Sequence, residues 1–495
     1  GTRAQLFVGD LDREGIISTE PRHISRGIDG DIPSKPFGDI SEIAYAPDGQ
    51  SLVFSVRIAG TSEPWSTHFD LYRTPVDGSA APVNLTPDNP AWATAPIFTR
   101  DGRSLIYKAM TRPGYEADRF GLMIRKLETG TVREIAPQWD RSVDGMALSA
   151  DGRTIYCTAD DLGQHALFAV DVATGAVTPL LQQGTVAGFS VGADAIFYTF
   201  NSLGDPDQLH RIDTTGGKTT QLTHHNRERM AQIGLGEYEQ FSFPGWHDQT
   251  VHGYVVKPWN YQKGKKYPVA FIIHGGPQGS MGNDWHYRWN PQVYAGWGYA
   301  VVFIDFHGST GYGQAFTDSI SGDWGGKPLV DLQKGWQYAL DRYDFLDGSR
   351  VAALGASYGG YIINWIAGNW PGAFKCLVNH AGVFDNRMMY YATDELWFDE
   401  WEQGGTHYEH PQNYEKFNPV NHVIQWQDPM LVIHGAQDFR IPLEQGLATF
   451  TALQRRGIAS ELLIFPDENH WVQKPQNSLA WHDAVHDWLR RWTGG

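Results

Sequence analysis

In the first half of the chain, short stretches of alternating hydrophobic and polar residues recur, separated by turn residues. The segment Ala46-Pro47-Asp48-Gly49-Gln50-Ser51-Leu52-Val53-Phe54 has counterparts around Asp101 and Asp151, and a weaker one at Asp194. Asp-Gly turns between short strands at a period of roughly 50 residues are typical of a β-propeller, in which each small antiparallel sheet forms one blade. A β-sandwich with similar hairpins is the alternative.

A second hairpin pattern lies between these segments. It is clearest over residues 122–136, 167–181 and 209–223, with looser copies over 71–86 and 6–25. Counting this hairpin predicts about five blades, of which the first is incomplete. Because a ring must close to cover its edge strands, we expect further N-terminal blades outside this sequence. The propeller is assigned to residues 1–238.

Near Glu239 the pattern changes to longer hydrophobic runs that alternate with amphipathic stretches. Of the 19 tryptophans, only Trp65, Trp92 and Trp139 precede this point. Buried strands are predicted at 251–256, 269–273, 300–304, 351–354, 376–379, 431–433 and 461–464, and helices at 329–342, 443–456 and 478–492. Such alternation predicts a mostly parallel sheet with helices on its faces. Residues 239–495 are therefore expected to form an α/β domain.

Composition and charge narrow the classes of partner. With 39 basic and 56 acidic residues, the formal charge of −17 argues against nucleic acid or an anionic membrane as the main partner. No hydrophobic run is long enough to span a membrane. Cys157 and Cys376 have neither metal-ligand spacing nor a disulfide pattern, and we expect them to fill the core. The first residues form neither a signal peptide nor a natural start.

One turn carries a candidate nucleophile. Gly355-Ala356-Ser357-Tyr358-Gly359-Gly360 follows the hydrophobic run Val351 to Leu354 and precedes a helical stretch at 361–367. Glycines two residues before and after a serine let a strand and a helix approach closely, which holds the hydroxyl at the carboxyl end of the strand. By itself the motif also fits an ordinary strand-to-helix turn.

Two further residues are candidates for the catalytic acid and base. Asp438 follows the predicted strand at 431–433, and His470 follows the last strand at 461–464. Taken singly, Asp438 fits a turn cap and His470 a surface histidine. Nucleophile, acid and base in the order Ser357, Asp438, His470, each after a strand, is the arrangement of α/β-hydrolases.

A glycine turn is the candidate for the fourth part of a hydrolase site, the oxyanion hole. His274-Gly275-Gly276-Pro277 ends the strand expected to precede the serine. Its backbone N–H groups can point at a developing oxyanion, whereas the alternative is a plain Gly-Pro turn.

A propeller followed by a hydrolase domain with a Ser-Tyr-Gly-Gly motif resembles the prolyl oligopeptidase family. Gly308-Ser309-Thr310-Gly311-Tyr312-Gly313, Asp323-Trp324-Gly325-Gly326-Lys327-Pro328 and Phe465-Pro466-Asp467-Glu468-Asn469-His470-Trp471-Val472 are similar to its acylaminoacyl-peptidase branch. These motifs cover most of residues 265–475. The first half resembles the family in repeat style alone.

The resemblance implies a serine exopeptidase that releases dipeptides from the N-terminus of oligopeptides, with an apolar residue before the cut and an acyl-enzyme on Ser357. It implies that the backbone N–H groups of Gly276 and Tyr358 form the oxyanion hole and that Arg440 binds a substrate carbonyl. By the same resemblance Val383, Phe384, Tyr390 and Tyr391 would line the apolar pocket, joined by the ring of Tyr358. Core packing is the alternative for these side chains, and a surface ion pair is the alternative for Arg440.

Other readings stay open. An acylaminoacyl-peptidase, an oligopeptidase of the same family and an esterase would use the same triad, and a non-catalytic scaffold would leave it inert. No cofactor or metal is expected, and His407 and His410 are interpreted as a solvated loop. The sequence does not identify the groups that hold the substrate amine, and it leaves a homodimer open. The resemblance suggests a periplasmic or secreted protein, with the cytoplasm as the alternative.

Overall fold

The computed structural model describes residues 2–35 and 38–494, and its first half is built from antiparallel strands. In chain order these are β1 (Phe7–Val8), β2 (Arg22–His23), β3 (Ile43–Tyr45), β4 (Ser51–Val56), β5 (Asp70–Pro75), β6 (Val83–Asn84), β7 (Ala93–Phe98), β8 (Ser104–Ala109), β9 (Gly121–Lys126), β10 (Val132–Glu134), β11 (Met146–Leu148), β12 (Thr154–Asp161), β13 (Gln164–Asp171), β14 (Val177–Leu181), β15 (Thr185–Val191), β16 (Ala195–Ser202), β17 (Asp205–Asp213) and β18 (Thr220–Gln221). Short helical turns η1 (Ile40–Glu42), η2 (Gly60–Trp65) and α1 (Arg227–Met230) accompany them.

These strands pair in consecutive groups. Strands β3 to β6 and β7 to β10 each form a four-stranded sheet, whereas β1 and β2 pair alone. Strands β11 to β14 and β15 to β18 pair in the same way, and one parallel bridge between His165 and Thr185 joins the two groups. The Asp-Gly segments form the β3–β4, β7–β8 and β11–β12 hairpins, and the second pattern forms β9–β10, β13–β14 and β17–β18. The predicted hairpins are therefore present as strand pairs.

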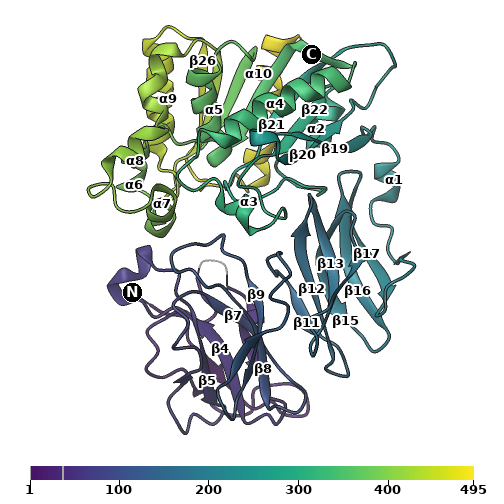
Figure 1. Ribbon diagram of the computed structural model, residues 1–495, viewed down its shortest axis with the longest axis vertical. Coiled ribbons are helices and arrows are strands. Elements are labelled where there is room, and N and C mark those ends of the chain that lie inside the picture. Colours follow the sequence, from purple (N-terminus) through teal and green to yellow (C-terminus); the bar gives the residue numbers. More distant parts are fainter. Residues whose placement is uncertain (1, 36–37, 495) are drawn as a thin grey trace.

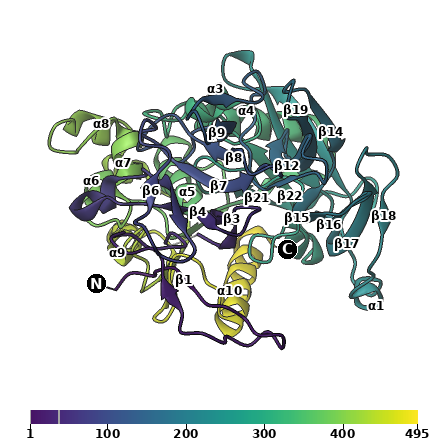
Figure 2. The same cartoon turned by 90° about the horizontal axis from the view of Figure 1, so that it is seen from below.

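Figure 1 shows these sheets side by side beneath the second half of the chain, with β4 to β9 on one side and β11 to β17 on the other. Viewed from below in Figure 2, the sheets follow an arc. Helix α10 of the second half is visible between β1 at one end of the arc and the β15–β18 group at the other.

The second half is an α/β region around one eight-stranded sheet of order β19-β20-β22-β21-β23-β24-β25-β26. Its strands are β19 (Tyr238–Pro244), β20 (Thr250–Val256), β21 (Tyr267–Ile273), β22 (Ala300–Asp305), β23 (Leu346–Ala356), β24 (Cys376–His380), β25 (Met430–Gly435) and β26 (Ser460–Phe465). The helices are η3 (Trp246–Asp248), α2 (Pro291–Gly296), α3 (Gln314–Asp318), α4 (Lys327–Arg342), α5 (Tyr358–Asn369), α6 (Asn386–Tyr390), α7 (Leu396–Gln403), α8 (Pro411–Lys416), η4 (Pro419–Gln425), α9 (Leu443–Arg455) and α10 (Pro475–Thr493).

From β22 to β26 the strands of this sheet run parallel, and both of its faces are covered. Successive side chains of a strand point to opposite faces. Val269, Phe271 and Ile273 of β21 accordingly join a core with α4, α5 and α9. Ala270 and Ile272 join a second core with α2 and α10. This layering explains why the seven predicted strands are continuous hydrophobic runs.

The two cysteines lie in the cores, as expected from the sequence. Cys157 belongs to the core between the propeller-like sheets, and Cys376 belongs to the core under α10. Burial raises the pKa of the Cys157 thiol to about 12.

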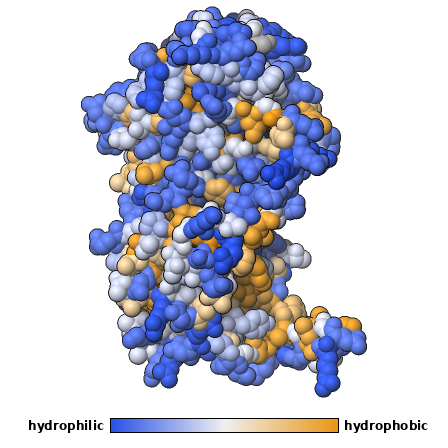
Figure 3. Space-filling view, turned by 90° about the vertical axis from the view of Figure 1, so that its right-hand side faces the viewer, coloured by the Kyte–Doolittle hydropathy of each residue, from blue (hydrophilic) through white to orange (hydrophobic). Residues whose placement is uncertain are grey.

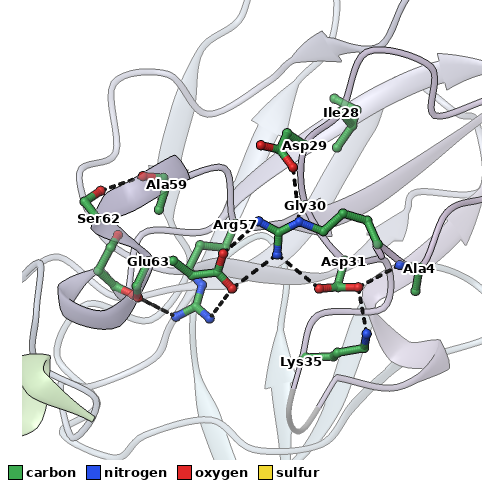
Figure 4. A network of polar contacts seen from close by, with 12 residues as sticks. Ala4, Ile28, Asp29, Gly30, Asp31, Lys35, Arg57, Ala59, Ser62 and Glu63 are labelled. Carbon is green, nitrogen blue, oxygen red and sulfur yellow. Dashed lines mark hydrogen bonds and ion pairs between the residues drawn. The ribbon is translucent and has the colours of Figure 1, made fainter. Parts of the chain in front are cut away.

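A polar network fastens the N-terminal segment to η2 (Figure 4). Arg3 contacts Asp29, Asp31 and Glu63, and Glu63 in turn contacts Arg57. The Arg57 guanidinium also lies 5.3 Å from the centre of the Phe69 ring and 5.6 Å from that of Trp397 on α7. The network therefore lies where the first half of the chain meets helix α7 of the second.

One side of the molecule exposes hydrophobic residues in its lower part, over the N-terminal sheets (Figure 3). Exposed large hydrophobic residues of these sheets include Phe7 on β1, Phe197 on β16 and Leu209 on β17. Within residues 2–35 and 38–494, no helix has the length and hydrophobicity needed to cross a membrane.

Candidate active site

Ser357 sits on a strained turn between β23 and α5. Its backbone has φ 60° and ψ −123°, a conformation that residues with a side chain rarely adopt. A Cβ on Gly355 would lie 2.4 Å from the carbonyl oxygen of Gly359, and a Cβ on Gly359 would lie 2.2 Å from that of Ile273. The glycines are thus required for the close contact of strand and helix that presents the serine hydroxyl.

Asp438 and His470 meet beyond the carboxyl ends of β25 and β26. Nδ1 of His470 donates to Oδ2 of Asp438 across 2.7 Å. The other oxygen, Oδ1, accepts the backbone N–H groups of Arg440 at 3.0 Å and Ile441 at 2.9 Å. Asp438 is 3 % exposed, so its carboxylate is held on both oxygens away from water. This arrangement leaves Nε2 as the nitrogen of His470 that is available to a reacting group.

The glycine turn after β21 lies directly beside Ser357. A Cβ on Gly275 would lie 3.1 Å from Cβ of Ser357, and Gly276 adopts φ 125°, which only glycine takes readily. Tyr358 is the first residue of α5, where a backbone N–H has no partner inside the helix. Both backbones reach the same cavity as Ser357.

The turn is braced from behind by buried polar groups. Nε2 of His274 lies 2.9 Å from Oγ of Ser309. The ring of Tyr358 is buried between Phe306, Trp324 and Tyr361, and its hydroxyl donates to the carbonyl of Trp324. Burial holds the pKa of that hydroxyl well above its usual value. The ring therefore packs the core behind the site.

A cavity of about 780 Å³ encloses these groups between the N-terminal sheets and the α/β region. Its lining includes Ser357, Tyr358, Gly276, Arg440 and His470 from the α/β region. From the N-terminal sheets it includes Lys108, Met110, Tyr115, Glu116, Phe120, Arg141 and His165. Its volume is in the range of sites that bind small ligands or short peptides.

Contacts across the cavity rim hold the two halves of the chain together. Arg112 pairs with Asp318 at 2.7 Å, and Tyr115 stacks on Trp401 with ring centres 4.4 Å apart. On the other side, Oγ1 of Thr310 donates to Asp160 at 2.7 Å. A substrate inside the cavity is thus surrounded by both halves.

The four residues predicted to line an apolar pocket do not all reach the cavity. Val383 reaches the cavity, whereas Phe384 packs edge-on against Trp426 in the core. Tyr390 is buried and donates to Glu400, and Tyr391 is 63 % exposed beside His407. None of these three side chains is part of the lining of the cavity. Its hydrophobic lining near Ser357 comes instead from Trp324, Val383, Met389, Phe398 and Ile441.

Arg440 reaches the cavity in company with carboxylates and an indole. Its guanidinium pairs with Glu395 and lies 3.8 Å from Asp394, and its Cζ lies 5.3 Å from the centre of the Trp471 ring. Both Arg440 and Glu395 line the cavity, so the pair faces whatever the cavity binds.

The acidic groups of the cavity, among them Glu395 and Glu116, escaped the sequence analysis. Glu395 precedes α7, and Glu116 lies on the loop between β8 and β9. Burial, helped by Glu116, Asp394 and Asp438, outweighs Arg440 and raises the pKa of Glu395 above its usual value. Burial also raises the pKa of Glu116. They come from distant segments without a motif, so no spacing could have linked them.

Among residues 2–35 and 38–494 no cluster of histidine, cysteine and carboxylate groups has the arrangement of a metal site. His407, one of the pair interpreted as a solvated loop, lies 3.0 Å from the hydroxyl of Tyr391 through Nδ1.

Fold and site together define a serine hydrolase of the α/β type with an additional β-rich domain over its active site. Comparison with known proteins gives the particular family. The prolyl oligopeptidase family matches residues 285–495. The chain is 36 % identical over 514 residues to dipeptidyl-peptidase 5 of Schizosaccharomyces pombe, covering all of this chain and 73 % of that protein. It is 38 % identical over 482 residues to dipeptidyl-peptidase 5 of Arthroderma otae, covering 93 % of this chain and 66 % of that protein.

Solved structures show the same architecture. An acylaminoacyl peptidase in complex with Z-Gly-Gly-Phe-chloromethyl ketone superposes with a TM-score of 0.82 at 24 % identity, covering 98 % of this chain and 73 % of that one. The acylaminoacyl peptidase of Pyrococcus horikoshii gives a TM-score of 0.81 at 23 % identity, with the same coverage. The fold is thus that of a β-propeller joined to an α/β-hydrolase domain.

The chain belongs to the prolyl oligopeptidase family and is a serine peptidase. It spans 73 % of the length of the S. pombe relative and 66 % of that of the A. otae relative.

Proposed function

We propose that this peptidase removes dipeptides from the N-terminus of oligopeptides, through an acyl-enzyme on Ser357. The observation that carries the proposal is the shared cavity of about 780 Å³, which holds Ser357, His470 and a carboxylate cluster between the two halves of the chain. The relatives named dipeptidyl-peptidase 5 support the same activity.

In the proposed mechanism, Nε2 of His470 takes the proton from Ser357 as the hydroxyl attacks the scissile carbonyl. Asp438 holds the proton on Nδ1 through the 2.7 Å hydrogen bond and stabilises the imidazolium that forms. The N–H groups of Gly276 and Tyr358 stabilise the oxyanion, each by about 3 kcal/mol in comparable sites. His470 then protonates the leaving amine, and water repeats the sequence on the acyl-enzyme.

Recognition of a free amine requires a negative group at a fixed distance from the serine. Glu395 and Glu116 line the cavity together with Arg440. Burial raises the pKa of both carboxyls, Glu116 adds to the rise at Glu395, and Arg440 opposes the rise at both. In the proposal, Arg440 donates to a carbonyl of the bound dipeptide and the two glutamates bind its ammonium group. A substrate ammonium would favour the ionised form of Glu395, whose pKa is raised in the free protein.

A hydrophobic residue before the cut fits the side chains around the nucleophile. Trp324, Val383, Met389, Phe398 and Ile441 line the cavity and bring no charge to it. Burial of an apolar side chain among them would favour binding by roughly 25 cal/mol for each Å² removed from water.

The proposal extends to the domain bounds and the number of propeller blades. We assign residues 1–238 to a propeller of about five blades, the first incomplete, and residues 239–495 to the hydrolase domain. The four four-stranded groups, the lone β1–β2 pair and the arc in Figure 2 support that count. A homodimer and a periplasmic or secreted location are further predictions.

An acylaminoacyl-peptidase is the second candidate, since the solved structures named above are of acylaminoacyl peptidases. Coumarin amides of a free dipeptide, an N-acetylated dipeptide and an N-acetylated amino acid separate the two candidates. We expect the free dipeptide to be cleaved with the highest kcat/KM. Faster cleavage of the acetylated amino acid would contradict the proposal, and cleavage of simple acyl esters alone would indicate an esterase.

A further inference from the structure

The cavity holds one cationic side chain whose surroundings differ from those of the others. Among the described residues, Arg141 pairs with Asp161 at 2.7 Å, Lys108 lies 3.9 Å from Asp144, and Arg440 pairs with Glu395. Arg288 also lines the cavity, and within 4.0 Å of its guanidinium no carboxylate is found in residues 2–35 and 38–494. Its charge is therefore uncompensated in the free protein.

This guanidinium is also partly withdrawn from water. Arg288 is half-buried on the loop between the glycine turn and α2. Burial lowers its pKa, and no carboxylate acts in the opposite direction. A half-buried cation without a partner has lost part of its hydration and has no counter-charge in return. An anionic ligand at this place would supply that counter-charge and be bound favourably.

Arg288 lies close to the catalytic groups. Its charge, after burial, helps to hold the pKa of His380 well below the usual value, as does that of His470. The carbonyl of His380 accepts the backbone N–H of Ser357 at 3.0 Å. His380, at the end of β24, thus contacts the backbone of Ser357, and Arg288 lines a small pocket together with His380.

Arg288 and Arg440 lie near neighbouring residues of the loop that carries His470. Trp471 lies under the Arg440 guanidinium, with 5.3 Å from Cζ to the ring centre. Val472, the next residue, lines a small pocket together with Arg288 and His380. Both arginines also line the large cavity with His470.

In the proposed function, on which this inference rests, Arg440 marks the side of the dipeptide that becomes the acyl group. The imidazole of His470 delivers its proton to the amine of the peptide that leaves. The side of His470 opposite Arg440 is then the side of the leaving peptide.

We propose that Arg288, which lines the same cavity, lies on this leaving-peptide side, binds the C-terminal carboxylate of the leaving peptide and so gives the enzyme a preference for short oligopeptides with a free C-terminus. A planar guanidinium makes two parallel hydrogen bonds to a carboxylate, a geometry that a lysine does not reproduce. Because Arg288 occupies a fixed place in the cavity, its contact with the carboxylate selects one length of leaving peptide.

The test compares peptides that differ only at the C-terminus. Peptides of three to six residues are prepared as free acids and as C-terminal amides, together with a dipeptidyl coumarin amide, whose leaving group has no carboxylate. For one length we expect kcat/KM of the acid to exceed that of the amide by about tenfold. Arg288→Gln is expected to bring this ratio near one, and Arg288→Lys to retain part of it.

Matched controls distinguish a failure of this inference from a failure of the proposed function. Arg211→Gln, an arginine on β17 that pairs with Asp213, should keep the ratio of the parent. Coumarin release reports whether each variant has an assembled active site. A ratio near one at every length in the parent, or an unchanged ratio in Arg288→Gln, would overturn the inference while leaving the proposed function intact. No release of coumarin by the parent would overturn the proposed function and this inference with it.

Discussion

Oδ2 of Asp438 accepts the Nδ1 proton of His470 across 2.7 Å, while Oδ1 is occupied by the backbone N–H groups of Arg440 and Ile441. In Asp438→Asn, the amide oxygen must stay with these two N–H groups, so the NH₂ group faces Nδ1. The imidazole then carries its proton on Nε2 and cannot act as a base. We expect kcat to fall by about 10⁴, as in other triads.

The measurement for this variant is kcat on a free dipeptidyl coumarin amide. Asp467→Asn, on the same loop as His470 but pairing with Lys474 at the surface, is the matched control and should retain parental kcat. A decrease of less than tenfold in Asp438→Asn would mean that Asp438 does not orient the base.

Replacing the nucleophile should abolish turnover without unfolding the chain. Ser357→Ala removes one hydroxyl and keeps the glycines on which the turn depends, so we expect kcat to fall by roughly 10⁴ to 10⁶. Mass spectrometry should find a fluorophosphonate on Ser357 of the parent and none on the variant. If turnover survives in protein freed of contaminating hydrolases, another residue is the nucleophile.

The carbonyl-binding role of Arg440 predicts a loss of substrate capture with an intact nucleophile. For Arg440→Ala we expect KM for dipeptidyl substrates to rise by about tenfold or more, because a charged hydrogen bond is worth about 1.5–3 kcal/mol. Labelling of Ser357 by a fluorophosphonate should continue at a similar rate. Arg456→Ala, whose guanidinium bonds to the carbonyls of Ile424 and Trp426 outside the cavity, is the control. Unchanged peptide kinetics in Arg440→Ala would exclude the role.

The amine-binding role of Glu395 predicts a selective loss. In Glu395→Gln we expect kcat/KM for a free dipeptidyl reporter to fall by roughly 10- to 100-fold, the effect of removing one partner of a charged hydrogen bond. The N-acetylated reporter should change much less. Glu400→Gln, on α7 and bonded to Tyr390, serves as the matched control. Equal losses for the free and acetylated reporters would indicate that Glu395 serves only to hold Arg440.

Asp399 on α7 predicts a stability that depends on pH. Burial, followed by the charges of Glu402, Glu395 and Glu400, raises the pKa of its carboxyl to about 8. In the unfolded chain an aspartate has a pKa of about 3.9. Between these values the folded protein keeps the proton and the unfolded chain has lost it. Stability therefore falls as pH rises towards 8, by up to about 1.4 kcal/mol per pH unit.

The amide of Asp399→Asn has no proton to lose, so this contribution to the fall of stability with rising pH should be absent from the variant. We expect its thermal midpoint, relative to that of the parent, to rise progressively between pH 5 and pH 8 and to level off above. Asp487→Asn, exposed on α10, should show a constant difference over the same range. A difference for Asp399→Asn that does not vary with pH would mean that this carboxyl is ionised throughout.

Much of the architecture followed from local patterns. The strand runs at 269–273 and 300–304 are hydrophobic throughout because both faces of the parallel sheet are covered, and β21 and β22 contain them. The Asp-Gly hairpins at Asp48, Asp101 and Asp151 were recognisable because a tight turn of this kind requires a residue with positive φ at Gly49, Gly102 and Gly152. Both signals depend on residues close in the sequence.

The pocket shows where this reasoning failed. Phe384, Tyr390 and Tyr391 follow β24 closely enough to be placed at the active site, but none of them lines the cavity. Phe384 packs against Trp426, Tyr390 bonds to Glu400, and Tyr391 is exposed. The helices between β24 and β25 are short and lack a long amphipathic pattern, so the sequence did not predict how they pack. Glu395, which lines the cavity, belongs to this same segment between β24 and β25.

What the sequence determined by itself was therefore the set of elements and the order of Ser357, Asp438 and His470, because strand periodicity and turn chemistry act over a few residues. Only the tertiary structure decided which charges share the cavity. Glu116, Arg288, Glu395 and Arg440 come from four separate segments. The last three meet through the folding of the α/β region, and the docking of the N-terminal sheets adds Glu116 to them. Packing between distant surfaces leaves no periodic signal along the chain. The pairing of Arg440, and the lack of a carboxylate partner for Arg288 within residues 2–35 and 38–494, could therefore be read only from the folded protein.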